Sequence, residues 1–381
     1  MTYFGYGKRM RIGIVVTQSE QGGVQVFLSQ FMIWLKSQNH EIGVFAGSEG
    51  WLTERCHEAG IPFTLLKHLK REINPLHDLL AIRELRYALR DFKPDAIHLN
   101  STKTGVIGSI AGRLAHVSRI VYRIGGWVFL EDLSAWKKAF YKYAEIWTAR
   151  FKDVIICVHP NDVEIAKSIG IKPKLRLISV PNGIDLPAFE SQLLARDEAR
   201  NTLALDSYFT FGTVANFYQP KNLPQYIEVC SIVAKQFPNA RFVIIGDGEE
   251  RALIESGIQT HQLKENVILV GARTDADRLY RAFDVFVLPS SKEGMSWALL
   301  RAMASGLPCI ATDVGAARFM LEPNAGVITP SKNPTELANA MIALEEDEQR
   351  RKELGQNAKE AVQNRFPLKR TLSENASALL N

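Results

Sequence analysis

The chain has few cysteines and no long apolar run. No stretch of its 381 residues approaches the roughly 20 consecutive apolar residues that a membrane-spanning helix needs. The four cysteines form no Cys-x-x-Cys pair and no cluster with histidine; they are Cys56, Cys157, Cys230 and Cys309. The sequence therefore argues against a spanning helix and a zinc site, and its isolated cysteines favour a reducing cytoplasm.

Signals for export and for repeat architecture are also absent. Residues 1–11 are aromatic and basic and hold no apolar core of a secretory signal, so we expect a short lead before the first strand. What the chain does have is a globular composition, with 46% hydrophobic and 23% charged residues, and a length sufficient for two α/β domains. Its net charge of +5 suits an anionic lipid, a nucleotide-sugar or a nucleic acid and does not choose among them.

Short apolar runs alternate with helical stretches along the whole chain. Such alternation predicts parallel, doubly wound sheets, because a buried parallel strand is apolar on both faces. We expect strands at 11–17, 41–45, 96–99, 120–123, 154–158, 208–215, 241–245, 267–270, 285–288, 309–311 and 326–328. We expect helices at 24–38, 75–92, 134–151, 191–203, 222–236, 249–262, 276–282, 334–345 and 368–379. The turn-rich segment 180–185 separates two such series and predicts two domains.

The most informative stretch is residues 288–313, LPSSKEGMSWALLRAMASGLPCIATD. An apolar strand ends in a small polar turn with Glu293 and Gly294, and a helix follows that ends at Gly306. The first turn of a helix leaves backbone N–H groups unpaired, so such a turn can bind an anion. A carboxylate beside it can accept hydrogen bonds from ligand hydroxyls. The stretch therefore predicts a site for an anionic ligand that carries hydroxyl groups.

This stretch resembles the donor-sugar site of the retaining GT-B glycosyltransferases, the group 1 and family 4-like enzymes. In that group one Glu opens the helix and a second lies eight positions later; the first matches Glu293, whereas position 301 is Arg301. The resemblance implies an α/β protein with the GT-B fold, in which two Rossmann-like doubly wound domains face a central cleft. It places the acceptor-side domain at 1–185 and the nucleotide-sugar domain at 186–365, with a C-terminal helix at 366–381 packing back on the first domain.

The resemblance also implies roles for individual residues. Lys221 matches a family lysine that grips the donor diphosphate, while Asn216 replaces the usual arginine. Donor binding is assigned to Gly23, Asn216, Lys221, Gly246, Gly248, Arg273, Glu293, Gly294, Met295, Ser296 and Arg301, and catalysis to Glu293, Lys221 and His98. Structural roles without a ligand remain as alternatives. Lys221 is then a solvated lysine, Glu293 caps the helix and Arg273 forms a surface ion pair. Asp247 and Glu249 are expected to cap the following helix.

The first domain supplies the expected acceptor-side residues, which are Asn100, Lys103, Arg123, Gly125 and Trp127. Gly125 stands where many relatives have the histidine of a His-Gly-Trp segment. Gly22 and Gly23 follow the first strand and form either a loop whose N–H groups face a ligand or a flexible turn. His98 lies in an apolar strand, where it is either a ligand of the cleft or a core histidine.

Arg301 is the most serious departure from the family pattern. The family's second Glu accepts hydrogen bonds from ribose hydroxyls, whereas an arginine side chain only donates. Arg301 can donate to ribose oxygens, or bind a phosphate or an acidic sugar bidentately. The other interpretation is that the pocket has lost its nucleotide.

The helix expected at 134–151 carries aromatic side chains at helical spacing. They are Trp136, Phe140, Tyr143, Trp147 and Phe151, flanked by Lys137, Lys138, Lys142, Arg150 and Lys152. One interpretation is a contact of residues 134–152 with an anionic membrane that holds a lipid-linked acceptor. The other is a stripe that faces the core of the domain.

Together these features predict a cytoplasmic retaining glycosyltransferase, free in the cytoplasm or peripheral on the inner face of the membrane. By analogy it moves a sugar from a nucleotide-sugar, a UDP-sugar, to a lipid-linked glycan for a bacterial surface polysaccharide. In the family the leaving diphosphate helps to deprotonate the acceptor, so we expect no cofactor, no metal, no Asp-x-Asp metal motif and no nucleic-acid partner. A non-catalytic GT-B protein that binds a glycan or a partner enzyme, and a nucleotide-sugar epimerase, are the alternatives.

Overall fold

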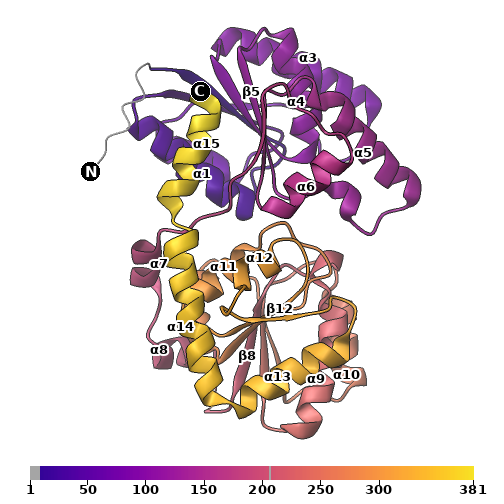
Figure 1. Ribbon diagram of the computed structural model, residues 1–381, viewed down its shortest axis with the longest axis vertical. Coiled ribbons are helices and arrows are strands. Elements are labelled where there is room, and N and C mark those ends of the chain that lie inside the picture. Colours follow the sequence, from indigo (N-terminus) through magenta and orange to yellow (C-terminus); the bar gives the residue numbers. More distant parts are fainter. Residues whose placement is uncertain (1–8, 206) are drawn as a thin grey trace. The chain divides into compact units, whose positions relative to one another are not determined.

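The computed structural model describes residues 9–205 and 207–381, so most of the expected N-terminal lead lies outside the described residues. The chain forms two compact units (Figure 1). Unit 1 ends at Asn182 and takes in Arg370–Asn381, and unit 2 is Gly183–Lys369. The sequence places the corresponding limits at 185 and 365. Each unit is a parallel sheet covered by helices, which confirms the predicted fold class.

Unit 1 contains a seven-stranded parallel sheet in the order β3-β2-β1-β4-β5-β6-β7. Its strands are β1 (Arg11–Val16), β2 (Glu41–Ala46), β3 (Phe63–Leu65), β4 (Ala96–Asn100), β5 (Arg119–Ile124), β6 (Val154–Cys157) and β7 (Arg176–Ser179). The order runs outward from β1 to β3 on one side and from β4 to β7 on the other, so the winding reverses between β1 and β4. The sequence does not predict β3 and β7, because none of the residues of these short edge strands is buried and neither strand has a continuous apolar run.

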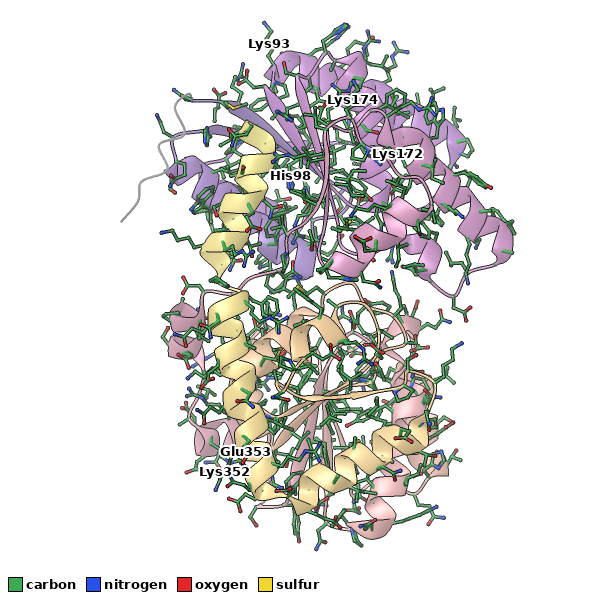
Figure 2. The ribbon with its side chains drawn as sticks, in the orientation of Figure 1. Lys93, His98, Lys172, Lys174, Lys352 and Glu353 are labelled. Carbon is green, nitrogen blue, oxygen red and sulfur yellow. The ribbon has the colours of Figure 1, made fainter. Side chains whose placement is uncertain are left out.

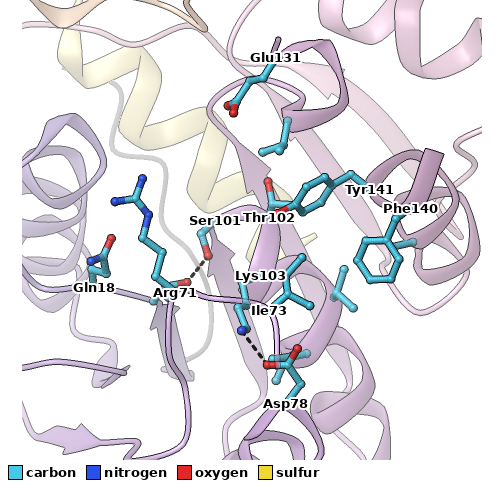
Figure 3. Close-up of a pocket in the computed structure, with 15 residues that line it drawn as sticks. Gln18, Arg71, Ile73, Asp78, Ser101, Thr102, Lys103, Glu131, Phe140 and Tyr141 are labelled. Carbon is cyan, nitrogen blue, oxygen red and sulfur yellow. Dashed lines mark hydrogen bonds and ion pairs between the residues drawn. The ribbon is translucent and has the colours of Figure 1, made fainter. Parts of the chain in front are cut away.

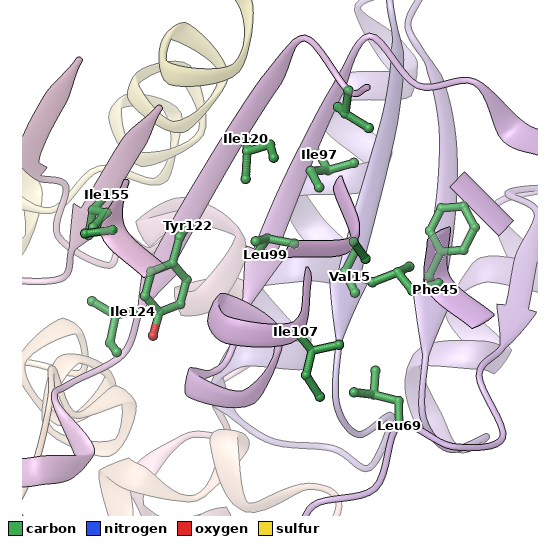
Figure 4. Close-up of a cluster of buried hydrophobic side chains, with 14 of the residues drawn as sticks. Val15, Phe45, Leu69, Ile97, Leu99, Ile107, Ile120, Tyr122, Ile124 and Ile155 are labelled. Atoms are coloured by element: carbon green, nitrogen blue, oxygen red, sulfur yellow. The ribbon is translucent and has the colours of Figure 1, made fainter. Parts of the chain in front are cut away.

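Helices cover both faces of this sheet. They are α1 (Gly23–Ser37), α2 (Trp51–Glu58), α3 (Pro75–Phe92), α4 (Thr102–Leu114), α5 (Ala135–Ala149), α6 (Pro160–Ser168) and α15 (Leu368–Leu380), with a 3-10 turn η1 (Val128–Leu130). The helices α3 to α6 pack on one face of the sheet. Their buried side chains form one apolar core with alternate residues of the strands (Figure 4). Side chains between those residues, such as His98 on β4, point to the opposite face and meet α1 and Asn375 of α15.

The helix α3 shows how local sequence sets these elements. Asn74 caps its N-terminus by accepting hydrogen bonds from the N–H groups of Leu76 and His77, and Pro75 occupies its first position. Ala81, Leu85 and Leu89 recur every four residues and bury one face. Capping and spacing together predict the observed helix.

Unit 2 contains a six-stranded parallel sheet in the order β10-β9-β8-β11-β12-β13. Its strands are β8 (Thr210–Val214), β9 (Arg241–Ile245), β10 (Val267–Gly271), β11 (Val285–Leu288), β12 (Cys309–Thr312) and β13 (Val327–Thr329). Here the winding reverses between β8 and β11. Loops that follow these two adjacent strands therefore meet at the point where open α/β sheets bind ligands.

The helices of unit 2 differ from the sequence prediction in several places. They are α7 (Leu186–Gln192), α8 (Arg196–Thr202), α9 (Leu223–Gln236), α10 (Arg251–Thr260), α11 (Trp297–Ala304), α12 (Ala317–Leu321), α13 (Pro334–Glu346) and α14 (Glu348–Arg365), with 3-10 turns η2 (Gln219–Lys221), η3 (Ala276–Arg278) and η4 (Tyr280–Ala282). The single helices predicted at 191–203 and 276–282 are wrong, since each region is two shorter pieces. The polar helix α14 was missed, because it buries only Leu354, Gly355, Ala358 and Val362.

Across residues 9–205 and 207–381, none of the helices combines the length and apolar character needed to cross a bilayer.

Candidate functional site

Lys221 and Glu293 meet at the winding reversal of unit 2. Lys221 lies in the loop after β8 and Glu293 in the loop after β11. Lys221 Nζ donates to Glu293 Oε1 at 2.6 Å, and Ser290 Oγ donates to the same oxygen at 2.7 Å. The two residues that the sequence singled out most strongly, 72 positions apart, therefore form one charged pair.

The Lys221–Glu293 pair is mostly buried. The side chains of Lys221 and Glu293 are 16% and 11% exposed. Burial by itself would lower the pKa of Lys221, but the charge and hydrogen bond of Glu293 outweigh it and raise that pKa above its ordinary value. Lys221 is therefore a fixed cation, and the interpretation of a solvated surface lysine is wrong.

Hydrogen bonds to backbone carbonyl groups tie the two loops together. The N–H of Ser291 donates to the carbonyl of Pro220 at 2.9 Å, and Asn222 Nδ2 donates to the carbonyl of Pro289 at 3.2 Å. Ser296, and not Glu293, caps α11, because its Oγ accepts the N–H of Leu299. The capping alternative for Glu293 is therefore excluded, and its carboxylate is held by Lys221 and Ser290.

Two neighbouring loops approach so closely that they need glycine. Gly315, after β12, has φ +54°, and a Cβ there would lie 2.4 Å from the carbonyl oxygens of Glu293 and Gly294. Gly246, after β9, has φ +150°, and its Cβ would lie 1.9 Å from the Ala215 carbonyl oxygen. Four loops at the carboxyl edge of the sheet thus fix the backbone around the charged pair. Gly248 likewise packs against Phe217.

Arg301 has a partner that the sequence did not suggest. Its Nε lies 3.1 Å from Asp277 Oδ2, and its guanidinium lies 5.7 Å from the centre of the Trp297 ring. Burial raises the pKa of Asp277, and the charge of Arg301 opposes that rise. Arg301 is thus paired with the carboxylate of Asp277 from η3. Although position 301 lacks the family's glutamate, a carboxylate is therefore still present beside it.

Comparison with known proteins identifies the chain. A family model described as Glycosyl transferases group 1 matches residues 195–361, and one described as Glycosyl transferase 4-like domain matches residues 22–183. The chain is 30% identical over 346 residues to the UDP-Gal:alpha-D-GlcNAc-diphosphoundecaprenol alpha-1,3-galactosyltransferase of Escherichia coli, with 89% of each chain covered. The chain belongs to the group 1 glycosyltransferases.

Further relatives of this glycosyltransferase agree with the assignment. It is 25% identical to the capsular polysaccharide biosynthesis glycosyltransferase CapM of Staphylococcus aureus, with 78% of this chain and 80% of CapM covered. The crystal structure of Anabaena HepE in complex with UDP and glucose matches with a TM-score of 0.83 at 20% identity, covering 97% of this chain and 99% of HepE. The expected GT-B fold and glycosyltransferase activity are confirmed, and neither curated relative is named as an epimerase or a binding protein.

His98 is not a catalytic residue of the glycosyltransferase. Its side chain has no exposed surface and lies beside the rings of Phe27 and Phe31. Figure 2 marks the place of His98 within unit 1. Burial, and then the nearby charge of Arg123, lower its pKa to about 3, so the imidazole is neutral at physiological pH. The prediction of catalysis by His98 is wrong, and the core interpretation holds, because the residue faces α1 and α15 within unit 1.

Most expected acceptor-side residues also lie in the interior of unit 1. Arg123 is 5% exposed, donates to Asn182 Oδ1 at 2.7 Å and lies 4.1 Å from the centre of the Phe27 ring. Trp127 is fully buried and donates from Nε1 to the carbonyl of Asp162. Asn100 is 1% exposed and donates to the carbonyl of His98. These three side chains stabilise the unit, and their assignment to acceptor binding is corrected.

Gly125, Gly23 and Lys103 differ from those buried residues. Gly125 has no atom within 4 Å of the position a Cβ would take, so a side chain would fit there. Gly23 begins α1, directly after the extended Gly22, where an added Cβ would meet the flexible side chain of Gln25. Lys103 lines a cavity of unit 1. A binding role for these three stays a prediction.

The other polar residues singled out in unit 2 lie in the loops after β8, β9 and β10. Arg273 pairs bidentately with Asp275 at 2.8 Å for both bonds, which matches the ion-pair interpretation. Asn216 is exposed in the loop after β8. Asp247 pairs with Arg251, and Glu250 is the N-cap residue of α10 without a side-chain bond, so the predicted capping by Asp247 and Glu249 is wrong.

The expectation that the chain has no Asp-x-Asp motif is also wrong, because Asp275-Ala276-Asp277 has this spacing. Its two carboxylates are bonded to Arg273 and Arg301. Within the described part of the chain, no group of three or more acidic, histidine or cysteine side chains is placed to hold a metal ion.

Sequence reasoning missed three residues of the site. Ser290 orients Glu293, Asp277 pairs with Arg301, and Gly315 allows the loop after β12 to approach. Ser290 directly follows Pro289 at the end of an apolar strand, a position where polar ligand-binding side chains are common in α/β sheets, and that signal was available. The other two depend on long-range packing that no local pattern reveals.

Proposed function

We propose that this glycosyltransferase transfers a sugar from a UDP-sugar, with retention, to a lipid-linked glycan used for a bacterial surface polysaccharide. The Lys221–Glu293 pair at the winding reversal of unit 2 carries the donor half of the proposal. The E. coli relative, named for UDP-Gal and a GlcNAc-diphosphoundecaprenol acceptor, supports both substrates. The HepE complex with UDP and glucose supports a nucleotide-sugar in the same fold.

The residues of unit 2 suit the charge that develops when a nucleoside diphosphate leaves. Lys221 supplies a buried cation beside the loop that begins α11, where the positive end of the helix dipole adds to it. Glu293 accepts hydrogen bonds from donor hydroxyls and holds Lys221 in place. The Gly294, Met295 and Ser296 backbone and the Arg301–Asp277 pair extend the proposed donor site. No side chain needs to act as a nucleophile in this scheme, and no cofactor is proposed.

The proposal predicts that UDP binds the isolated protein and that UDP-galactose is consumed only with an acceptor. The measurement is UDP release with a panel of UDP-sugars and with GlcNAc-diphosphate joined to a dodecyl chain, followed by NMR of the new anomeric bond. Transfer with an α-linkage is expected. An absence of UDP binding by calorimetry, or a product with the inverted anomer, contradicts the proposal.

The aromatic face of α5 supports a membrane contact. Trp136, Phe140, Tyr143 and Trp147 are 68%, 50%, 65% and 49% exposed, so the interpretation of a core-facing stripe is wrong for these four. The helix instead turns Glu145, Thr148 and Ala149 inward. Lys137, Lys138, Lys142 and Arg150 lie on the same helix and its end, and such a basic amphipathic face suits an anionic bilayer surface.

A double substitution tests this contact. Trp136→Ser with Trp147→Ser is expected to weaken co-sedimentation with phosphatidylglycerol vesicles about a hundredfold, since burying each large side chain contributes about 1.5–3 kcal/mol. Leu253→Ser in unit 2, where the leucine is 60% exposed, is the control and should bind vesicles normally. Unchanged vesicle binding by the double variant overturns the membrane contact.

A further inference from the structure

Unit 1 contains a cavity of about 380 Å³ at its own winding reversal. Thr17 and Gln18 follow β1, and Ser101, Thr102 and Lys103 follow β4, the two strands between which the order turns back. The volume lies within the range of about 300–1,000 Å³ typical of small-molecule sites. The cavity thus has the size and the place of a ligand site, and it belongs to unit 1 alone.

The lining of the cavity divides into a polar and an aromatic wall. Figure 3 shows Gln18 and Arg71 on one side and Tyr141 and Phe140 on the other. The lining residues Ser101 and Thr17 are hydrogen-bonded to each other through Oγ and Oγ1 at 2.6 Å. Burial, and then the charge of Glu131, raise the pKa of Tyr141, so its hydroxyl stays a hydrogen-bond donor. Hydroxyl and amide groups opposite aromatic rings suit a sugar, whose ring has polar edges and apolar faces.

The two cations of the cavity differ in what they are free to bind. Lys103 Nζ forms an ion pair with Asp78 at 2.7 Å and donates to the carbonyl of Glu72. Arg71 forms no hydrogen bond or ion pair with any described residue, although its side chain lines the cavity. Its planar guanidinium can bind two phosphate oxygens at once. The nearby N-terminus of α4, which begins at Thr102, adds favourable potential for the same anion.

Exposed apolar side chains rim this cavity. Ile73 and Phe140 line it and are 47% and 50% exposed. Leu76 and Leu79 flank the lining residue Asp78 in the sequence of α3 and are 66% and 65% exposed. The rim continues into the aromatic face of α5 through Phe140. A ligand whose head group fills the cavity could therefore carry an apolar chain that leaves over this rim.

We infer that this cavity binds the acceptor head group: a saccharide joined through a phosphate or diphosphate to an apolar chain. The inference rests on the proposed function and adds the place and the chemistry of its second substrate. The sugar lies between the polar wall and Tyr141, the phosphate is bound by Arg71, and the apolar chain passes Ile73 and Phe140. A soluble glycosyl phosphate shares the first two contacts and lacks the third.

Binding of defined probes tests the inference with the full chain and saturating UDP. The main probe is GlcNAc-diphosphate on a dodecyl chain; GlcNAc 1-phosphate and dodecyl N-acetylglucosaminide lack the chain and the phosphate, respectively. Arg71→Ala should weaken binding of the main probe about ten- to hundredfold, as expected for a charged hydrogen-bonding group. It should leave binding of the phosphate-free probe unchanged. Val106→Phe, which narrows the cavity from α4, should weaken binding of all three probes.

Controls separate this inference from the proposed function. Arg83→Ala removes an exposed arginine of α3 that lies over the Tyr87 ring and does not line the cavity, and this variant should bind every probe as the unaltered chain does. UDP affinity, measured in the same samples, should not change in any variant. Equal binding by Arg71→Ala and the unaltered chain, or tighter binding of GlcNAc 1-phosphate than of the main probe, overturns the inference while leaving the donor site intact. If the unaltered chain does not bind UDP, the proposed function itself is contradicted.

Discussion

Glu293→Gln is expected to lower sugar transfer by about 100- to 1,000-fold, the size of effect that follows removal of one preorganised charged group from an active site. The amide keeps the shape of the side chain but cannot hold the charge of Lys221, whose Nζ lies 2.6 Å from the carboxylate. It also replaces one of the two acceptor oxygens that could bind donor hydroxyls with an NH2 group, which only donates. The measurement is the rate of UDP release from UDP-galactose with the diphosphate-linked acceptor.

The pH of this assay does not confound the result. Because the pKa of Lys221 is raised above its ordinary value of 10.5, the stability from the pair is fully present below that pH and is lost only as pH rises through the folded-state pKa. At neutral pH the unaltered protein therefore has the full contribution. In Glu293→Gln, burial of Lys221 is no longer opposed by Glu293, so a lower melting temperature is expected as well.

A matched control is Glu265→Gln, an exposed glutamate of unit 2 outside the site. It should transfer sugar at the normal rate. Lys221→Met together with Glu293→Gln should be less than additive, because each substitution alone already breaks the same pair. Normal turnover by a folded Glu293→Gln protein would remove the Lys221–Glu293 pair from the proposed donor site.

The sequence predicts the sheets of this protein because parallel strands that are buried on both faces consist of continuous apolar runs. The central strands β1, β4, β8 and β11 carry such runs and were found within two residues of their observed ends. The edge strands β3 and β7 are half exposed and left no such signal. Helix α14 was missed for the same reason, since its buried stripe is narrow and its exposed faces are charged.

The candidate site divides in the same way. Lys221 and Glu293 could be predicted because each follows a central strand, and their pairing follows from the winding order of the sheet. The side-chain directions of His98 and Arg123 could not, because the sequence does not say which face of a two-sided buried sheet a strand residue meets. The exposure of the aromatic side chains of α5 could not be predicted either, because an aromatic stripe has the same helical spacing whether it faces the core or the solvent.

Gly315→Ala is expected to lower kcat/KM by about ten- to a hundredfold, because even a displacement of about 1 Å in a catalytic group can cost that much. The added Cβ would lie 2.4 Å from the carbonyl oxygens of both Glu293 and Gly294, so one loop must move. The left-handed backbone at φ +54° adds about 1–2 kcal/mol of strain for a residue with a Cβ. Steady-state kinetics and thermal unfolding together measure the two effects.

Gly170→Ala separates strain from displacement. Gly170 has φ +83°, also in the left-handed region, but no atom lies within 4 Å of its Cβ position. Both variants should therefore lose stability from backbone strain, whereas only Gly315→Ala should lose activity and, because of the close contact, further stability. Equal kcat/KM values for the two variants would mean that the loop after β12 does not hold Glu293 in its working position. A selective loss in Gly315→Ala would show that the backbone contact between these loops positions the charged pair.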